Sequence, residues 1–169
     1  MDKAEAAAKS AAASKVFLDD ELYENAGVIM LYMPLGNETD TTEIISKAFS
    51  DGKKLVFPVT DKENGEITPC YAGKETVFAE GAFSVREPAE KDVADVSEID
   101  VIVVPGIAFD KKGSRIGFGK GCYDRFLKNC PAVKIGFCYD FQAAHDIPTE
   151  PHDIKMDFLI TENGKFKCE

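Results

Sequence analysis

Residues 101–106 read Val-Ile-Val-Val-Pro-Gly. Four consecutive β-branched residues that stop at a Pro-Gly pair are typical of a strand buried on both faces, as in the centre of a parallel sheet. Ligands of open α/β sheets bind beyond the carboxyl ends of such strands. The segment that follows residue 104 is therefore the first place to search for a functional site.

Apolar runs on either side of this strand alternate with helical patterns. Further strands are predicted at residues 28–32, 55–59, 66–71, 133–139 and 158–161, with turns at Asn64-Gly65 and Asn163-Gly164. Helices are predicted at residues 123–129 and from Asp40, paired with Glu43 as a reciprocal cap, to Gly52. Residues 72–94 are predicted to form loops. This alternation predicts an α/β fold with a largely parallel sheet and added hairpins.

The first fifteen residues are rich in alanine and favour a helical lead-in. They lack the apolar core of a signal peptide. Val16, Phe17 and Tyr23 predict one apolar helix face that ends near Gly27. A length of 169 residues predicts that residues 1–169 form a single domain.

Charge and cysteine content limit the partners and the compartment. Thirty acidic against twenty basic residues give a net charge of −10, which disfavours nucleic acid and anionic membrane surfaces. No apolar run approaches the roughly 20 residues of a membrane span. Five cysteines without a C-x-x-C pair indicate reduced thiols in a cytoplasmic protein.

Residues 113–125, Gly-Ser-Arg-Ile-Gly-Phe-Gly-Lys-Gly-Cys-Tyr-Asp-Arg, combine four glycines with three basic side chains. Glycines let backbone N–H groups approach an anion, and the helix predicted near Tyr123 adds its positive end. A glycine-rich hairpin that only turns the chain is the alternative. The coincidence of Arg115, Lys120 and Arg125 in an acidic protein favours a phosphate site.

Two common nucleotide motifs do not fit this spacing. A Walker loop requires Ser or Thr after Gly-Lys, but Gly121 follows Lys120. A dinucleotide fingerprint would need glycine where Cys122 stands. Asp124, directly beyond the glycines, could hold Mg²⁺ beside bound phosphates or interact with the dipole of its helix.

The stretch PGIAFDKKGSRIGFGKGCYDRFL at residues 105–127 resembles the 5-formyltetrahydrofolate cyclo-ligase family. The resemblance extends over most of the chain after Ser14, through the sequences at residues 37–45, 56–59, 83–88, 152–153 and 160–162. It implies a three-layer α/β fold related to the sugar-phosphate isomerase and CoA-transferase group. It also implies ATP- and Mg²⁺-dependent closure of 5-formyltetrahydrofolate to 5,10-methenyltetrahydrofolate, with phosphorylation of the formyl oxygen and release of ADP and phosphate.

The same resemblance implies roles for individual residues. Arg115 and Lys120 would be catalytic, as groups that neutralise the charge of the transferred phosphoryl group. The ATP-binding residues would be Arg115, Ile116, Gly117, Phe118, Gly119, Lys120, Gly121, Cys122 and Tyr123.

For Mg²⁺ the resemblance implies Asp124 and Asp153, with Asp157 as the substitute for the second ligand. Glu38 would accept hydrogen bonds from the pterin edge of the folate. Met33, Phe118 and Tyr123 would form the apolar wall of the folate slot, together with Cys122. Each of these apolar residues could equally belong to the core, and His152 is given no catalytic role.

Two positions depart from the family pattern. Members usually carry a basic pair in an N-terminal helix that helps to bind ATP, whereas only Lys3, Lys9 and Lys15 are available here. Cys122 replaces the usual aromatic residue before Tyr123. A folate- or nucleotide-binding protein of the same fold without turnover is the alternative function, and a sugar-phosphate isomerase-like enzyme is a third. The oligomeric state and the preferred polyglutamate length of the folate are not indicated by the sequence.

Overall fold

The computed structural model describes residues 1–169. Its middle layer is a seven-stranded sheet with the order β12-β11-β9-β6-β1-β2-β3. The strands are β1 (Val28–Met30), β2 (Lys54–Thr60), β3 (Ile67–Ala72), β6 (Val101–Val104), β9 (Val133–Phe137), β11 (Phe158–Thr161) and β12 (Gly164–Lys167). All neighbouring pairs are parallel except β2–β3 and β11–β12, the pairs at the two edges. The prediction of a mostly parallel sheet with added hairpins is confirmed.

Strand β6 lies in the middle of this sheet and has the predicted bounds. All four of its residues are buried. Val101 and Val103 belong to the core on one face of the sheet, while Ile102 and Val104 belong to the core on the other face. Burial on both faces explains why an uninterrupted β-branched run was needed here.

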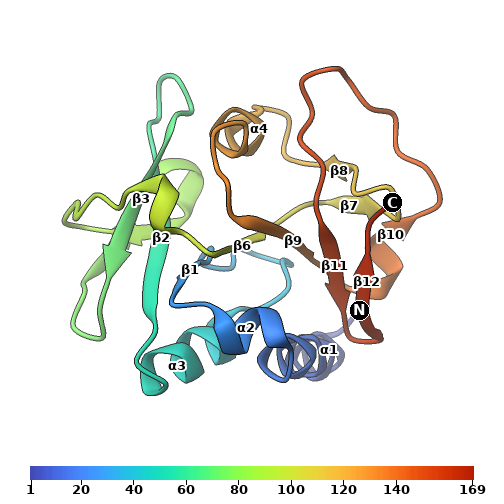
Figure 1. Ribbon diagram of the computed structural model, residues 1–169, viewed down its shortest axis with the longest axis horizontal. Helices are drawn as coiled ribbons and strands as arrows, with labels where there is room; N and C mark the ends of the chain where they lie inside the picture. The colour runs from blue at the N-terminus through green and yellow to red at the C-terminus, as the bar shows by residue number, and fades with distance from the viewer.

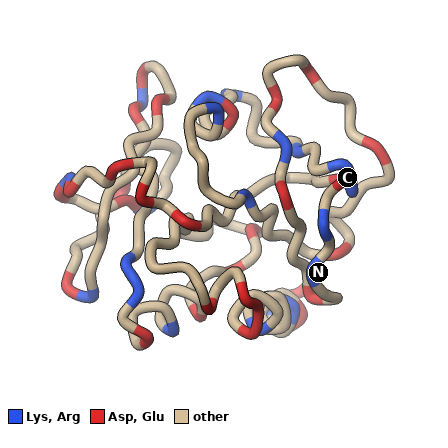
Figure 2. The backbone as a smooth tube through the Cα atoms, viewed as in Figure 1, with Lys and Arg blue, Asp and Glu red and all other residues tan.

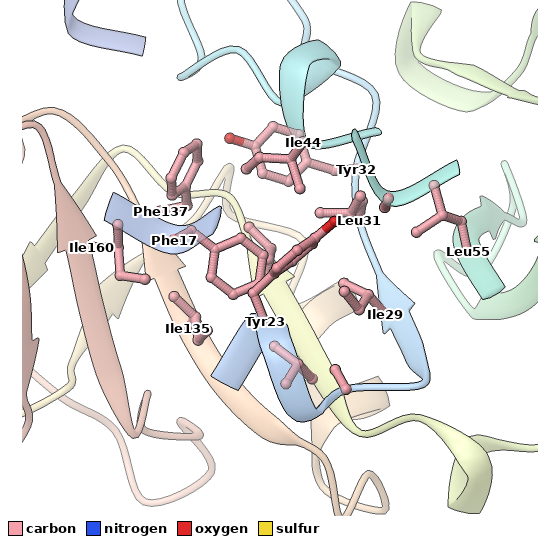
Figure 3. Close-up of a cluster of buried hydrophobic side chains, with 14 of the residues drawn as sticks. Phe17, Tyr23, Ile29, Leu31, Tyr32, Ile44, Leu55, Ile135, Phe137 and Ile160 are labelled. Carbon is pink, nitrogen blue, oxygen red and sulfur yellow. The ribbon is translucent and has the colours of Figure 1, made fainter. Parts of the chain in front are cut away.

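Three helices cover one face of the sheet: α1 (Lys3–Leu18), α2 (Glu21–Asn25) and α3 (Thr42–Ser50). They lie together along one side of the sheet in Figure 1. Figure 3 shows how Phe17 and Tyr23 from α1 and α2 gather with the strand residues Ile29, Ile135 and Ile160. This cluster fixes the first two layers.

The N-terminal prediction of one continuous helix up to Gly27 is wrong. Asp20 adopts an extended conformation, and its carboxylate accepts a hydrogen bond from the Leu22 N–H at 2.9 Å. It therefore caps a second helix, α2, instead of continuing α1. Tyr23 still reaches the same core as Phe17, with their ring centroids 5.5 Å apart.

The predicted reciprocal cap at the start of α3 is also wrong. Thr41 is the N-cap residue, and its hydroxyl donates to the Tyr32 carbonyl at 2.7 Å instead of capping the helix. Asp40 accepts from the Thr42 N–H at 2.8 Å. The loop that leaves β1 is thereby tied to the start of α3, and Glu43 is not needed for the cap.

The third layer consists of α4 (Cys122–Leu127) and a small sheet with the order β10-β7-β8. Its strands are β7 (Ala108–Asp110), β8 (Arg115–Ile116) and β10 (Ala143–Ala144). Phe109 and Leu127 pack with Ile102 and Val104 in the second core. In Figure 1, α4, β7 and β8 lie on the side of the sheet opposite to α1, α2 and α3. The three-layer arrangement is confirmed.

The loops predicted at residues 72–94 contain a short hairpin instead. It is formed by β4 (Phe78–Glu80) and β5 (Arg86–Pro88), with a 3-10 turn at Ala82–Ser84. Phe78 packs edge-to-face on Phe57 of β2, with ring centroids 5.1 Å apart. Tertiary packing thus stabilises strands that are too short to be predicted from local pattern. Two more 3-10 turns, Val96–Glu98 and Asp140–Gln142, complete the elements, and none of the helices could span a bilayer.

Asp110 at the end of β7 holds the β7–β8 turn and is fully buried. Its carboxylate accepts hydrogen bonds from the N–H groups of Lys112, Ser114 and Ile147 at 2.9–3.0 Å. Asp110→Asn is expected to lower the free energy of unfolding by about 1–3 kcal/mol, because an amide nitrogen then faces a buried donor. Urea unfolding measures this loss. The exposed Asp146→Asn is the control, and equal stability of the two variants would contradict the prediction.

Candidate active site

The glycine-rich segment, residues 113–125, runs from the β7–β8 turn through β8 into α4, beyond the end of β6. The chain leaves β6 through Pro105 and Gly106, runs out along β7 and returns along β8, where the Ile107 N–H donates to the Ile116 carbonyl at 2.7 Å. The helix predicted at residues 123–129 begins at Cys122 and ends at Leu127. Acidic and basic segments both occur around α4 in Figure 2.

Arg115 is the central side chain of this segment. Its Nη2 lies 3.1 Å from Asp124 Oδ2, and only 6% of the Arg115 side chain is exposed. The Tyr123 ring lies against the guanidinium, with its centroid 5.6 Å from Cζ. The Nε–H of Arg115 is buried and has no hydrogen-bond partner. Since buried donors are almost always paired, this unpaired N–H marks the guanidinium as a candidate ligand-binding group.

The glycines have two separable functions. A Cβ on Gly117 would lie 2.6 Å from Arg115 Nη1, so glycine lets the guanidinium occupy this position. Gly119 and Gly121 have φ angles of +89° and +61°, which favour glycine for conformational reasons. The spacing of glycines therefore serves the packing of Arg115 and the turn of the backbone into α4.

The Arg125 side chain holds the glycine-rich segment in place through hydrogen bonds to backbone carbonyls. Its guanidinium donates to the Lys120 carbonyl at 2.9 Å and to the Asn64 carbonyl at 3.0 Å. The turn between β2 and β3 is thereby joined to the glycine-rich segment. Arg125 acts as a clamp on the backbone, and its donors are used by carbonyl groups.

Lys120 is exposed and has a different environment. Its ammonium lies 3.9 Å from the centroid of the Phe83 ring, and it forms no ion pair within 4 Å. The positive charge of the Lys120 ammonium is therefore not neutralised by a carboxylate. Phe118, in the same segment, is 72% exposed and so is not a core residue.

Asp124 and the loop that contains Asp153 lie side by side. Asp124 Oδ1 accepts from the Ile154 N–H at 3.2 Å, and Asp153 Oδ2 accepts from the Glu150 N–H at 2.7 Å. Asp157 instead accepts from the Lys134 N–H at 2.7 Å and holds the start of β9. No group of three or more potential metal-ligating side chains occurs. Asp124 and Asp153 are carboxylates of the kind that bind Mg²⁺ when phosphates supply further oxygens.

Glu38 follows β1 and faces the same region. Burial raises the pKa of its carboxyl above the usual range, although the Leu35 N–H, which donates to it at 2.8 Å, acts in the opposite direction. Burial, and next the charge of Glu38, raise the pKa of the Tyr123 hydroxyl. The structure thus brings Glu38, Tyr123, Arg115 and Asp124 together. Met33 packs against the core under α1–α3, and no contact places it in this group.

The raised pKa of Glu38 predicts a pH-dependent effect on stability. The folded chain binds the Glu38 proton more tightly than the unfolded chain, so this stabilising contribution is full below the unfolded pKa, about 4.3, and is lost as the pH rises through the folded pKa. Glu38→Gln is therefore expected to be more stable than the wild-type chain at pH 7.5. Urea unfolding at pH 7.5 and near pH 4 should show that this advantage shrinks in acid. A constant difference would contradict the prediction.

The N-terminal lysines have structural partners. Lys9 lies 3.3 Å from both Glu5 and Glu162, and Lys15 pairs with Asp19 in α1.

Phe83 and Arg125 are the residues whose contacts sequence reasoning missed. A contact between residues far apart in the chain leaves no local signal.

Comparisons with known proteins agree on one family. The sequence profile of the 5-formyltetrahydrofolate cyclo-ligase family matches residues 1–162. The chain is 29% identical over 155 residues to the mouse 5-formyltetrahydrofolate cyclo-ligase (84% of this chain, 76% of the mouse protein) and 31% identical over 140 residues to that of Mycolicibacterium smegmatis (79% and 72%).

The solved structures give the same result. The structure of 5,10-methenyltetrahydrofolate synthetase from Aquifex aeolicus superposes with a TM-score of 0.87 at 31% identity and covers 99% of this chain and 84% of its own. The synthetase from Mycoplasma pneumoniae, at 23% identity, has the same fold with a TM-score of 0.76 and covers 96% of this chain and 90% of its own.

Proposed function

The chain belongs to the 5-formyltetrahydrofolate cyclo-ligase family, and we propose from this membership that it converts 5-formyltetrahydrofolate to 5,10-methenyltetrahydrofolate in an ATP-dependent reaction. The observation that supports this proposal most strongly is the buried guanidinium of Arg115, held against Asp124 and Gly117 with an unpartnered Nε–H. Such a donor suits an anionic oxygen of ATP or of the phosphorylated substrate.

The chemistry explains why a phosphate-binding segment must lie beside a folate slot. A formamide oxygen is a poor leaving group, so the γ-phosphoryl group of ATP is transferred to it, and the bond to the terminal phosphate of ATP breaks to release ADP. N10 of the folate then attacks the activated carbon and gives up its proton to water, and the C–O bond breaks to release phosphate. Positioning and charge neutralisation supply most of the catalysis in phosphoryl transfer.

Each residue of the glycine-rich segment has a defined role in this proposal. Arg115 and Lys120 neutralise the charge that develops on the transferred phosphoryl group. Residues 116–123 provide the remaining contacts to ATP, with Gly119 and Gly121 setting the turn of the backbone. Arg125 holds the segment in place through the Lys120 and Asn64 carbonyls.

Asp124 and Asp153 would hold Mg²⁺ when it arrives with the nucleotide. The ion would supply further neutralisation of phosphate charge. Asp124 also orients Arg115 through their ion pair. This pair is mostly shielded from water, since 6% of the Arg115 side chain and 19% of the Asp124 side chain are exposed. A single aspartate thereby fixes the guanidinium while its other oxygen accepts from the 150–154 loop.

The folate would bind between the β1 loop and α4. Glu38 would accept hydrogen bonds from the N–H groups of the pterin. Tyr123 and the exposed Phe118 offer aromatic surface to a flat heterocycle. Met33 packs against the core under α1–α3, so it would contribute to the apolar wall of the folate site only from that side.

Residues 1–169 act as one domain, because a single sheet includes strands from residue 28 to residue 167. The five cysteines are free thiols, which fits the reducing cytoplasm. The net charge of −10 fits small-molecule substrates better than nucleic acid. The non-catalytic alternative is not favoured, because Arg115, Lys120 and Asp124 are all present in the glycine-rich segment.

An absorbance assay tests the proposed function. Purified protein is mixed with 5-formyltetrahydrofolate, ATP and Mg²⁺, and the near-ultraviolet absorbance of the methenyl product is followed. Product should form only when ATP is present, with one ADP released for each methenyl group. Binding of folate without product, under conditions in which a known cyclo-ligase is active, would favour the non-catalytic alternative.

A further inference from the structure

The contact between Lys120 and Phe83 joins the glycine-rich segment to the β4–β5 hairpin. The Lys120 ammonium lies 3.9 Å from the centroid of the Phe83 ring, within the range of a cation–π interaction. A ring attracts the charge through its quadrupole but carries no negative charge that would neutralise it. Lys120 is therefore held while its full positive charge stays available to an anion.

The backbone at Phe83 is strained, and this strained conformation places the ring against the Lys120 ammonium. Phe83 and Ser84 have φ angles of +56° and +61°, in the left-handed region that bulky side chains rarely adopt. Strain of this kind persists only where the surrounding structure enforces it, and it is concentrated at functional sites. The ring of Phe83 is also half exposed, so core packing does not explain its position.

The surroundings enforce the strained turn through Glu87. This buried carboxylate accepts from the Thr60 N–H at the end of β2 at 2.9 Å. Its Oε2 lies 2.0 Å from where a Cβ on Gly81 would stand, so the turn closes tightly over it. The Gly81 N–H donates to the Val85 carbonyl at 2.8 Å and closes the turn around Phe83. A rigid frame thus connects the central sheet to the aromatic ring.

We infer that Phe83 is a positioning residue for Lys120: its ring keeps the ammonium in place beside the glycine-rich segment, so that ATP binds to an already ordered lysine. A lysine side chain loses considerable rotamer freedom when it is immobilised by a ligand. Ordering the side chain beforehand reduces this loss on binding. The role rests on the proposed function, because it assigns Lys120 to the phosphates of ATP.

The test measures the affinity of the protein for a non-hydrolysable ATP analogue with Mg²⁺ by calorimetry. Phe83→Leu, which keeps an apolar side chain without a ring, is expected to weaken binding roughly 3- to 10-fold. Phe83→Trp should restore it, because indole binds cations best. In a chain that also carries Lys120→Met, Phe83→Leu should weaken binding no further.

Fluorinated phenylalanines at residue 83 provide a test that changes shape very little. Successive fluorines reduce the negative potential of the ring face, so affinity for the analogue should fall in steps while the melting temperature stays constant. Equal affinity across this series, or the same loss from Phe83→Leu in the Lys120→Met chain, would overturn the inference. If the wild-type chain itself did not bind the analogue, the proposed function would fail instead.

Discussion

Arg115→Ala is expected to lower kcat/KM for ATP-dependent formation of the methenyl product by about 10²–10³-fold, the loss typical of removing one preorganised donor from a charge-stabilising site. The guanidinium is buried against Asp124, Gly117 and Tyr123, so these contacts hold it in one position before ATP binds. Arg115→Lys should recover only part of the rate, because an ammonium lacks the planar fork that meets a carboxylate and a phosphate together.

The matched control for this loss is Arg86→Ala. Arg86 is exposed on β5 and forms no ion pair, so its removal should leave kcat/KM within about 2-fold, as expected for a surface substitution. Activities are compared below the unfolding midpoint of each variant, because Arg115→Ala leaves Asp124 without its partner. Wild-type kcat/KM in a folded Arg115→Ala protein would show that Arg115 does not act on the phosphates.

Phe109→Ala is expected to cause the largest loss of stability, about 3–5 kcal/mol in the free energy of unfolding. Phe109 is fully buried in the second core. Its ring fills the space left by Gly106 and Gly136, where added Cβ atoms would lie 2.7 Å and 2.6 Å from ring carbons. Truncation therefore leaves a cavity between the central sheet and the strand that carries the site.

Urea unfolding of Phe109→Ala and of Phe141→Ala measures this effect. Phe141 is 65% exposed, so its truncation should lower stability by less than about 1 kcal/mol. Similar losses in the two variants would contradict the assignment of Phe109 as the main packing residue of the third layer. The Phe109→Ala chain should also have lower activity, because β7 leads into the β7–β8 turn before Arg115.

The parts of the fold that follow from local pattern were predictable. Strand β6 was predicted from four β-branched residues that end at Pro105, and β11 from a short apolar run before the Asn163-Gly164 turn. The small sheet of β7, β8 and β10 was not predicted. Its strands have two or three residues each, and they depend on pairing between segments that are far apart, such as Ala143 with Phe109.

The same distinction applies to the site. The chemistry of Arg115, Lys120 and Asp124 could be inferred from residue types within one segment. Their partners could not, because these come from other elements: Phe83 from the β4–β5 hairpin, Ile154 from the loop before β11, and Asn64 from the β2–β3 turn. The break between α1 and α2 was missed for a related reason, since Asp20 is recognised as a cap only when its hydrogen bond to Leu22 is seen.

The most direct test of the central claim is a crystal structure of the protein with a non-hydrolysable ATP analogue and Mg²⁺. The proposed site predicts that oxygens of the triphosphate lie within hydrogen-bonding distance of Arg115 and Lys120, with the ion beside Asp124. Triphosphate density away from residues 115–124 would contradict it, whatever activity the protein shows.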